Sequence, residues 1–422
     1  MTVEVTRLAD GLTIATDRMD SVETVSLGAW VRVGTRHERA ELNGVAHFLE
    51  HMVFKGTERR SARDIAQEIE AVGGYLNAYT GRESTAFHAK VLAEHLPLAL
   101  DLVSDIVQYP VFDETELTRE RAVVLQEIGQ VADTPDDVIF DHFQETAFPS
   151  QALGRPLLGR SETVAVLERT NLIDYRTRHY GPGDMVIAAA GRLEHDRFCD
   201  LAAAAFGALP TGGQVVAEPA RYSGGDFREA RELEQVHLVL GFEGVGHHDP
   251  DYYAAMVFST LFGGGMSSRL FQEVRELRGL AYAIHSFVSA YDDSGLFGVY
   301  AGTGQAEVAE LLSVVCGELG KLPSGLDSDE MARARAQLKA GVLMSREGTT
   351  SRCEQLANQL LLYGRPLAVA EVIERIESVD YAALERFTGR LTGSTPTLAV
   401  IGPIDCVESF DRLSARLAVR PG

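Results

Sequence analysis

The chain has 422 residues, which is too long for one ordinary core and predicts two or more domains. Its content of 45% hydrophobic and 24% charged residues is typical of soluble globular proteins. A formal net charge of -22 argues against nucleic acid as a partner and is compatible with a basic ligand. The alternative is that the charge only keeps the protein soluble.

Neither membrane insertion nor export is indicated. No apolar run approaches the roughly 20 residues that span a bilayer. The first residues, MTVEVTRLADGLTIATD, predict neither a signal peptide nor a transit peptide. The four cysteines are scattered, which argues against a disulfide framework or a thiolate metal site and fits a reducing cytoplasm. They are Cys199, Cys316, Cys353 and Cys406.

The first clear elements are a strand and a short helix. Residues 24–38, TVSLGAWVRVGTRHE, alternate as a half-buried strand does. In residues 43–56, NGVAHFLEHMVFKG, Asn43 is suited to cap a helix that Lys55 and Gly56 would end. Apolar residues recur along this helix at the spacing of a buried stripe: Val45, Phe48, Leu49, Met52 and Val53.

Two histidines and a glutamate share one part of that helix. His47 and His51 are four residues apart, so their imidazoles project from one face and are close enough to share a metal ion. Glu50 precedes the second histidine, and the order His-x-x-Glu-His is a recognised zinc-peptidase signature. The alternative is a helix with two partly buried, hydrogen-bonded histidines and no metal.

A zinc site needs a third protein ligand. Glu120 and Glu127 belong to a predicted helix over residues 112–127 and lie on one face of it, about 10.5 Å apart along the axis. Because this separation is too large for both to bind one ion, we expect one to be a ligand and the other to orient a ligand histidine. The alternative is that both glutamates are solvated, as most helical glutamates are.

The second half of the chain repeats the first. Residues 209–227 are rich in Gly, Pro and small residues and predict a linker. Residues 235–249 alternate like the first strand, and residues 326–341 repeat the Asp-opened, Arg-rich helix. We therefore expect an α+β fold of two duplicated domains, 1–208 and 228–422, each a mainly antiparallel sheet packed against helices.

The candidate ligands are not repeated. Aligning the halves places His47, Glu50, His51, Glu120 and Glu127 on residues of the second half that cannot bind metal. These are, in the same order, Phe258, Leu261, Phe262, Ala334 and Gly341. The polar cluster is therefore dispensable for the architecture, which favours a chemical role for it.

The sequence resembles the pitrilysin-type zinc peptidases over nearly its whole length, in particular the β subunit of mitochondrial processing peptidase and its bacterial relatives. His47, Glu50 and His51 match the family's inverted motif, and Glu127 falls 76 positions after His51, where the family places its third zinc ligand. The resemblance implies a pitrilysin-like fold with one Zn2+ per subunit. It also implies that Glu50 is the general base on the zinc-bound water and that Glu120 supports the site.

The same resemblance implies a role for the second half. Arg275 and Tyr282 in VRELRGLAY are seven apart, like the family's Arg/Tyr pair that completes the active site. A Tyr hydroxyl can donate to an oxyanion, and Arg can hold substrate carbonyls. In this family the zinc-bearing domain faces the second domain of a partner, so the resemblance implies a homodimer in which each chain completes the other's site.

Three stretches are expected to contact substrate. Residues 73–91 predict a hairpin, in which Asn77 and Ala78 match the family's edge strand that pairs with peptide backbones; the alternative is an ordinary core strand. Asp137 and Asp141 match acidic residues of the processing-peptidase β subunit, which recognise an arginine near the cleaved bond. Residues 261–271, LFGGGMSSRLF, resemble a glycine-rich loop of the family and lack the ending of a phosphate-binding loop.

The resulting hypothesis is a zinc-dependent endopeptidase of the bacterial cytoplasm that hydrolyses extended, basic peptides in a chamber formed by two subunits. The main alternative is a non-catalytic core subunit of a larger complex, since some relatives serve as such after losing ligands or base. The joint presence of the motif residues weighs against it. A bare metal-binding module is a third option that leaves Glu50 and the second half without a role.

Overall fold

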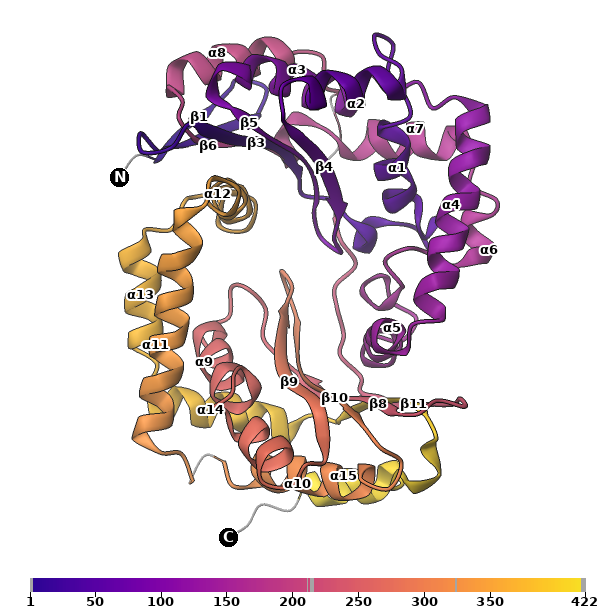
Figure 1. The fold of residues 1–422 in the computed structure, drawn as a ribbon, viewed down its shortest axis with the longest axis vertical. Helices are drawn as coiled ribbons and strands as arrows, with labels where there is room; N and C mark the ends of the chain where they lie inside the picture. The colour runs from indigo at the N-terminus through magenta and orange to yellow at the C-terminus, as the bar shows by residue number, and fades with distance from the viewer. Residues whose placement is uncertain (1–2, 211, 213–215, 323–324, 419–422) are drawn as a thin grey trace. The chain divides into compact units, whose positions relative to one another are not determined.

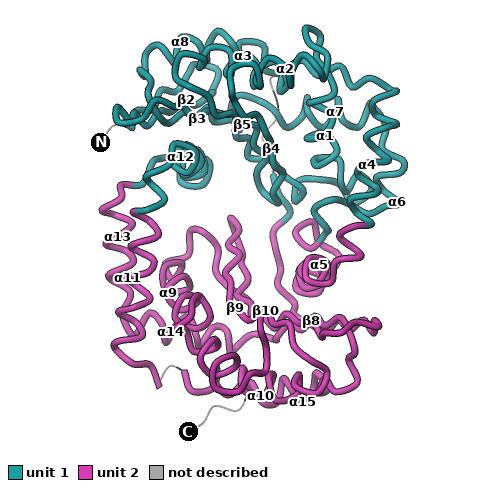
Figure 2. Tube along the Cα trace, viewed as in Figure 1, with its two compact units in different colours: residues 1–129, 155–218, 344–367 teal, residues 130–154, 219–343, 368–422 magenta. Residues whose placement is uncertain are grey.

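The computed structural model describes residues 3–210, 212, 216–322 and 325–418, so residues 211 and 213–215 of the predicted linker lie outside the described part. The chain forms two compact units (Figure 2). Unit 1 comprises residues 1–129, 155–218 and 344–367. Unit 2 comprises residues 130–154, 219–343 and 368–422.

Unit 1 is built on a six-stranded sheet in the order β1-β2-β6-β3-β5-β4. The β2/β6 pair is parallel and the other described pairs are antiparallel. The central strands are almost entirely buried because helices cover both faces of the sheet. The strands are β1 (Val3–Arg7), β2 (Thr13–Arg18), β3 (Thr24–Val31), β4 (Tyr75–Thr80), β5 (Thr85–Leu92) and β6 (Met185–Gly191).

Helices from distant parts of the chain cover this sheet. Helices α3 (Leu96–Gln108) and α8 (His195–Ala205) pack on one face, and α12 (Thr349–Tyr363) packs on the other (Figure 1). Leu356 and Leu360 of α12 are buried against Trp30 of β3. The remaining helices of unit 1 are α1 (Val45–Val53), α2 (Ala62–Ala71), α6 (Ser161–Val164) and α7 (Arg169–His179), and α4 (Glu114–Ala132) begins in unit 1 and ends in unit 2.

Unit 2 repeats this plan with five strands in the order β7-β11-β8-β10-β9. Its β7/β11 pair is parallel, as the corresponding β2/β6 pair is in unit 1, and the other pairs are antiparallel. The predicted α+β fold with two similar sheets is therefore confirmed. The strands are β7 (Gly225–Ala230), β8 (Val236–Glu243), β9 (Ala281–Ala290), β10 (Gly295–Thr303) and β11 (Thr397–Gly402).

The sheet of unit 2 is also covered on both faces. Helix α5 (Pro135–Ala147) packs on one face, against β7, β8 and β11, and α9 (Tyr252–Gly263) packs against β9 and β10. The other helices are α10 (Val308–Gly320), α11 (Ser328–Met344, whose last residue belongs to unit 1), α13 (Val369–Glu377), α14 (Tyr381–Gly393) and α15 (Phe410–Ala418).

The two units exchange one segment each. Residues 130–154 belong to unit 2 and residues 344–367 to unit 1, although each segment comes from the other half of the chain. The physical reason is burial, because α5 and α12 each cover an apolar sheet face that would otherwise be exposed. The domain bounds expected from the sequence, 1–208 and 228–422, do not take this exchange into account and stay a prediction.

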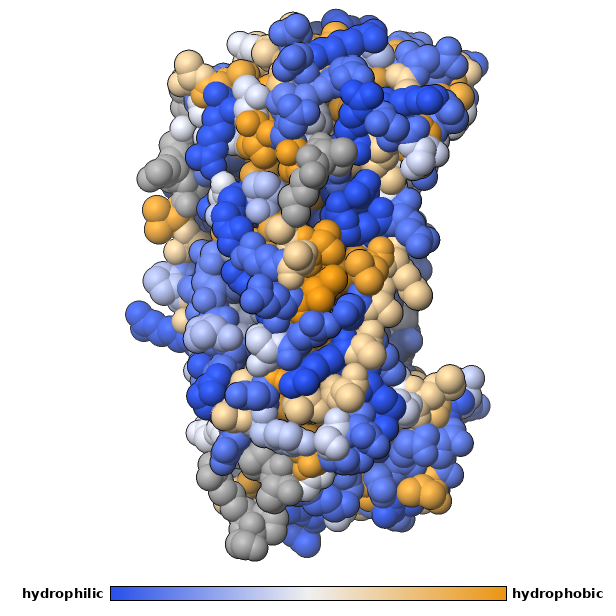
Figure 3. All heavy atoms as spheres, turned by 90° about the vertical axis from the view of Figure 1, so that its left-hand side faces the viewer, coloured by the Kyte–Doolittle hydropathy of each residue, from blue (hydrophilic) through white to orange (hydrophobic). Residues whose placement is uncertain are grey.

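The surface drawn in Figure 3 is mostly hydrophilic, with smaller apolar areas. Among the described residues, no helix combines the length and the apolar character that crossing a membrane requires. The four cysteines all lie in the described part of the chain and are free thiols.

Candidate metal centre

Helix α1 presents the two histidines at the border of the core of unit 1. The five apolar residues of its predicted stripe are fully buried. The helix ends at Val53, two residues before the predicted end, and its N-cap is Gly44, with φ 99°, rather than Asn43. The prediction for Asn43 is wrong because its side-chain amide instead donates to the carboxylate of Glu38 and to the carbonyl of Pro156.

Glu38 takes the capping role that the sequence assigned to Asn43. Its carboxylate accepts hydrogen bonds from the backbone N–H of Gly44 at 2.9 Å and of Ala46 at 2.8 Å. These donors belong to the first turn of α1, where backbone N–H groups lack partners within the helix. Burial raises the pKa of Glu38 to about 7, although these hydrogen bonds and Arg155 oppose the rise.

His47, His51 and Glu127 converge on one point. The Nε2 atoms of the two histidines are 3.2 Å apart, and Oε2 of Glu127 lies 3.8 Å from Nε2 of His47 and 3.6 Å from Nε2 of His51. Tetrahedral zinc with ligands at 2.0–2.1 Å would place these atoms roughly 3.4 Å apart. Burial, and then His51, lower the pKa of His47 to about 3, so its imidazole is neutral at pH 7. Spacing and donor type both fit a zinc ion.

Glu120 lies behind His51. Its Oε1 is 2.9 Å from Nδ1 of His51, and its side chain is only 7% exposed. Glu127 is 40% exposed. The alternative of two solvated glutamates therefore does not describe Glu120, whose position suits a carboxylate that fixes the orientation of a ligand imidazole.

Glu50 is adjacent to His51 on α1. Burial raises its pKa, and hydrogen bonding with Thr80 at the end of β4 partly offsets the rise. Its Oε2 is buried without a hydrogen-bond partner among the described residues. A carboxylate oxygen in this state needs a ligand or water to satisfy it.

The predicted edge strand is β4, the last strand of its sheet. Ala78 is 8% exposed and packs in the core, whereas Asn77 is exposed and its amide donates to the hydroxyl of Tyr75 at 2.5 Å. Since β5 is the only partner of β4 among the described strands, the backbone of its other side is open to pairing. Both predicted features, a strand in the core and a sheet edge, are thus present in β4.

The other predicted site residues lie in unit 2. The guanidinium of Arg275 lies 4.4 Å from the centre of the Tyr282 ring, and its Nη1 donates to the Tyr282 carbonyl at 3.2 Å. Tyr282 is 78% exposed. Asp137 and Asp141 are one turn apart on α5. The expected roles of these four residues, the Arg/Tyr pair in completing the active site and the aspartates in recognising substrate, stay predictions.

Two residues of the site were missed by sequence reasoning. Lys55, read only as a helix end, places its Nζ 2.7 Å from Oε2 of Glu120. Its position four residues after His51, the i, i+4 relation, was the available signal. Glu38 left no comparable signal, because a cap formed by a side chain several residues upstream has no fixed spacing.

Two family models match the chain in succession. Residues 13–161 match "Insulinase (Peptidase family M16)" and residues 167–338 match "Peptidase M16 inactive domain". The first match contains the histidine motif and Glu127, and the second contains Arg275 and Tyr282.

Similar proteins match over most of the chain. An "uncharacterized zinc protease" of Rickettsia felis is 37% identical over 95% of this chain and 98% of its own length. The β subunit of the mitochondrial-processing peptidase of Rattus norvegicus is 36% identical, over 98% of this chain and 87% of its own. Among solved structures, a protease from Helicobacter pylori has a TM-score of 0.88 at 19% identity, covering 95% of this chain and 99% of that one. A chain of complex III2 from Candida albicans also has a TM-score of 0.88, at 22% identity, covering 99% of this chain and 100% of that one.

The buried cap of α1 predicts a pH effect on stability. The pKa of Glu38 is about 7 in the folded chain against an ordinary value of 4.5, so the folded chain binds more protons than the unfolded chain between these pH values. Glu38 therefore lowers the free energy of unfolding as pH rises from 4.5 to 7. We expect Glu38→Gln to make this fall smaller, as measured by urea unfolding at several pH values. Glu41→Gln, at an exposed glutamate nearby, is the control, and an unchanged pH slope in Glu38→Gln would contradict the prediction.

Proposed function

The chain belongs to peptidase family M16 and is a metallopeptidase, and we propose that it is a zinc-dependent endopeptidase that cleaves extended peptides. The observation that carries this proposal is the convergence of His47, His51 and Glu127 at a spacing suited to zinc. Two imidazoles and a carboxylate are a known catalytic ligand set, and three protein ligands leave one position open. We assign one zinc ion to each chain.

Glu50 is the proposed general base. When bound, zinc acidifies a water molecule and polarises the scissile carbonyl. Glu50 removes a proton from the attacking water as the oxygen bonds to the carbonyl carbon, and returns it to the amine nitrogen as the C–N bond breaks. Its place beside His51 and the buried, unpartnered Oε2 support this role.

The free edge of β4 is the proposed binding site for the peptide backbone, at Asn77 and Ala78. Thr80, the last residue of β4, adjoins Glu50, so a peptide paired along β4 runs toward the proposed zinc site. Such pairing accepts many sequences, because main-chain hydrogen bonds supply much of the affinity. The net charge of -22 favours basic peptides.

The proposed assembly is a homodimer that encloses a chamber. Tyr282 is exposed and Arg275 stacks on its ring, so both side chains are available to a partner chain. There the Tyr hydroxyl would donate to the oxyanion of the tetrahedral intermediate, and Arg275 would hold substrate carbonyls. The proposed compartment is the bacterial cytoplasm, in agreement with the free thiols.

A non-catalytic core subunit is the second candidate, motivated by the shared fold with a chain of complex III2. The joint presence of Glu50 and the three candidate ligands favours the peptidase, because a core subunit needs neither a base nor a metal.

The first test is cleavage of a mixed peptide library by the zinc-loaded chain, followed by mass spectrometry. We expect chelators to abolish cleavage, and Glu50→Gln to lower kcat by at least about 100-fold because the proton transfer is lost. Glu50→Gln should keep one zinc per chain. Cleavage that survives this substitution contradicts the assigned base, and a zinc-loaded chain that cleaves nothing supports the core subunit.

The second test is complementation between inactive chains. If each chain completes its partner's site, mixing Glu50→Gln with Tyr282→Phe chains should form heterodimers with one intact site. Random exchange makes about half of the dimers heterodimers, so up to about a quarter of wild-type activity should return. Activity is measured with a quenched basic peptide after subunit exchange. No recovery, once labelled subunits prove the exchange, contradicts a shared site.

The third test concerns Asp137 and Asp141. If they pair with an arginine near the cleaved bond, Asp137→Asn and Asp141→Asn should each lower kcat/KM for an arginine peptide by about 10-fold, since a charge-assisted hydrogen bond is weakened. For a matched peptide with neutral glutamine in place of that arginine, each variant should keep the kcat/KM of the wild type. Equal losses for both peptides would mean that the aspartates have no part in selecting arginine.

A further inference from the structure

The carboxylate of Glu120 is held from two sides. Oε1 faces Nδ1 of His51 at 2.9 Å, and Oε2 pairs with the ammonium of Lys55 at 2.7 Å. The side chain of Lys55 is 30% exposed and that of Glu120 is 7% exposed. A nearly buried carboxylate is costly without a charged partner, so removing Lys55 costs more than breaking an ion pair on the surface.

Lys55 reaches Glu120 because the turn after α1 is fixed. Its backbone N–H donates to the Met52 carbonyl at 3.2 Å, and Gly56 follows with φ 124°, a conformation that favours glycine. The N–H of Thr57 then donates to the carbonyl of Arg60 at 2.8 Å, which closes the turn. The chain therefore leaves α1 in one defined direction.

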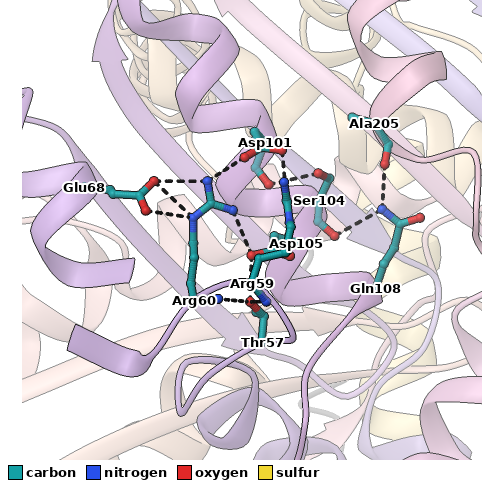
Figure 4. Close-up of polar contacts among 9 residues, drawn as sticks. All are labelled: Thr57, Arg59, Arg60, Glu68, Asp101, Ser104, Asp105, Gln108 and Ala205. Atoms are coloured by element: carbon teal, nitrogen blue, oxygen red, sulfur yellow. Dashed lines mark hydrogen bonds and ion pairs between the residues drawn. The ribbon is translucent and has the colours of Figure 1, made fainter. Parts of the chain in front are cut away.

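Figure 4 shows what anchors this turn to α3. Asp105, whose side chain is fully buried, accepts from Oγ1 of Thr57 at 2.8 Å, Nε of Arg59 at 2.9 Å and Nη1 of Arg60 at 2.8 Å. Asp101, one turn earlier, binds both arginines, at 2.9 and 2.6 Å. Because Arg59 and Arg60 each contact two carboxylates of one helix, the backbone next to Lys55 is held in place.

We infer that Lys55 is a positioning residue of the zinc site, and this inference rests on the proposed function. Lys55 fixes Oε2 of Glu120, Oε1 of Glu120 then fixes Nδ1 of His51, and Nε2 of His51 is left directed toward Nε2 of His47 and Oε2 of Glu127. Without the ammonium, Glu120 can turn away from His51, and the imidazole loses its fixed orientation. The partners behind a ligand histidine set metal affinity in this way.

The test compares zinc affinity in the full chain, by competition with a chromophoric chelator. We expect Lys55→Met to weaken zinc binding by about 10-fold, the lower end of what the loss of a ligand's partner costs. Lys55→Arg, which keeps a cation within reach of Glu120, should restore most of the affinity. With the quenched peptide at saturating zinc, Lys55→Met should lower kcat and leave KM nearly unchanged, because the peptide-binding edge of β4 is intact.

A matched control separates positioning from folding. Lys339→Met also removes a lysine from an ion pair with glutamate, at 2.6 Å and in unit 2, and should not change zinc affinity. Thermal unfolding of the metal-free chains reports the structural effect separately, and Lys55→Gln repeats the test if Lys55→Met does not fold. Wild-type zinc affinity in folded Lys55→Met or Lys55→Gln overturns the inference while leaving the proposed function intact. A wild-type chain that binds no zinc overturns both.

Discussion

The packing of α1 into the core of unit 1 is the constraint on which the candidate site depends. All five apolar side chains of its stripe are buried, and burial of each of the larger ones contributes about 1.5–3 kcal/mol to the stability of the folded chain. Hydrogen bonds between side chains at the border of the core typically contribute about 1 kcal/mol. Packing therefore sets the position of the helix. The positions of His47 and His51 follow from it, because these residues occupy the side of α1 that faces Glu120 and Glu127 of α4.

The sequence was sufficient for the fold class, the duplication and the grouping of three ligand candidates. The fold class and the duplication follow from periodicity and repeated patterns, and the pairing of His47 with His51 follows from their spacing on one helix. The choice of Glu127 as the third ligand came from the family resemblance. The cap by Glu38 could not be predicted in the same way, because a cap from a side chain several residues upstream has no fixed spacing. The exchange of α5 and α12 could not be predicted either, because it depends on contacts between segments far apart in the sequence. Lys55 could be predicted in part, since its spacing from His51 is visible in the sequence, whereas its ion pair with Glu120 is not.

The second unit shows what the architecture requires without the chemistry. Phe258, Leu261 and Phe262 of α9, which align with the motif residues, are all buried in an apolar core. A helix in this place therefore needs an apolar face, and histidines are an addition to it. Since the parallel pair recurs at the same place in both sheets, the two units share one plan, although the sheet of unit 1 has one more strand, β1.

The exchange of α5 and α12 makes the halves of the chain interdependent. A break within residues 209–227 would leave the first fragment without the helix that covers Trp30, Ala86 and Val186, and the second without the helix that covers Val239 and Ala399. Each fragment would then carry a bare apolar sheet face, which is a surface prone to aggregation. The duplicated copies are thus no longer separable modules. Since each half supplies a helix to the sheet of the other, the two halves have to fold together.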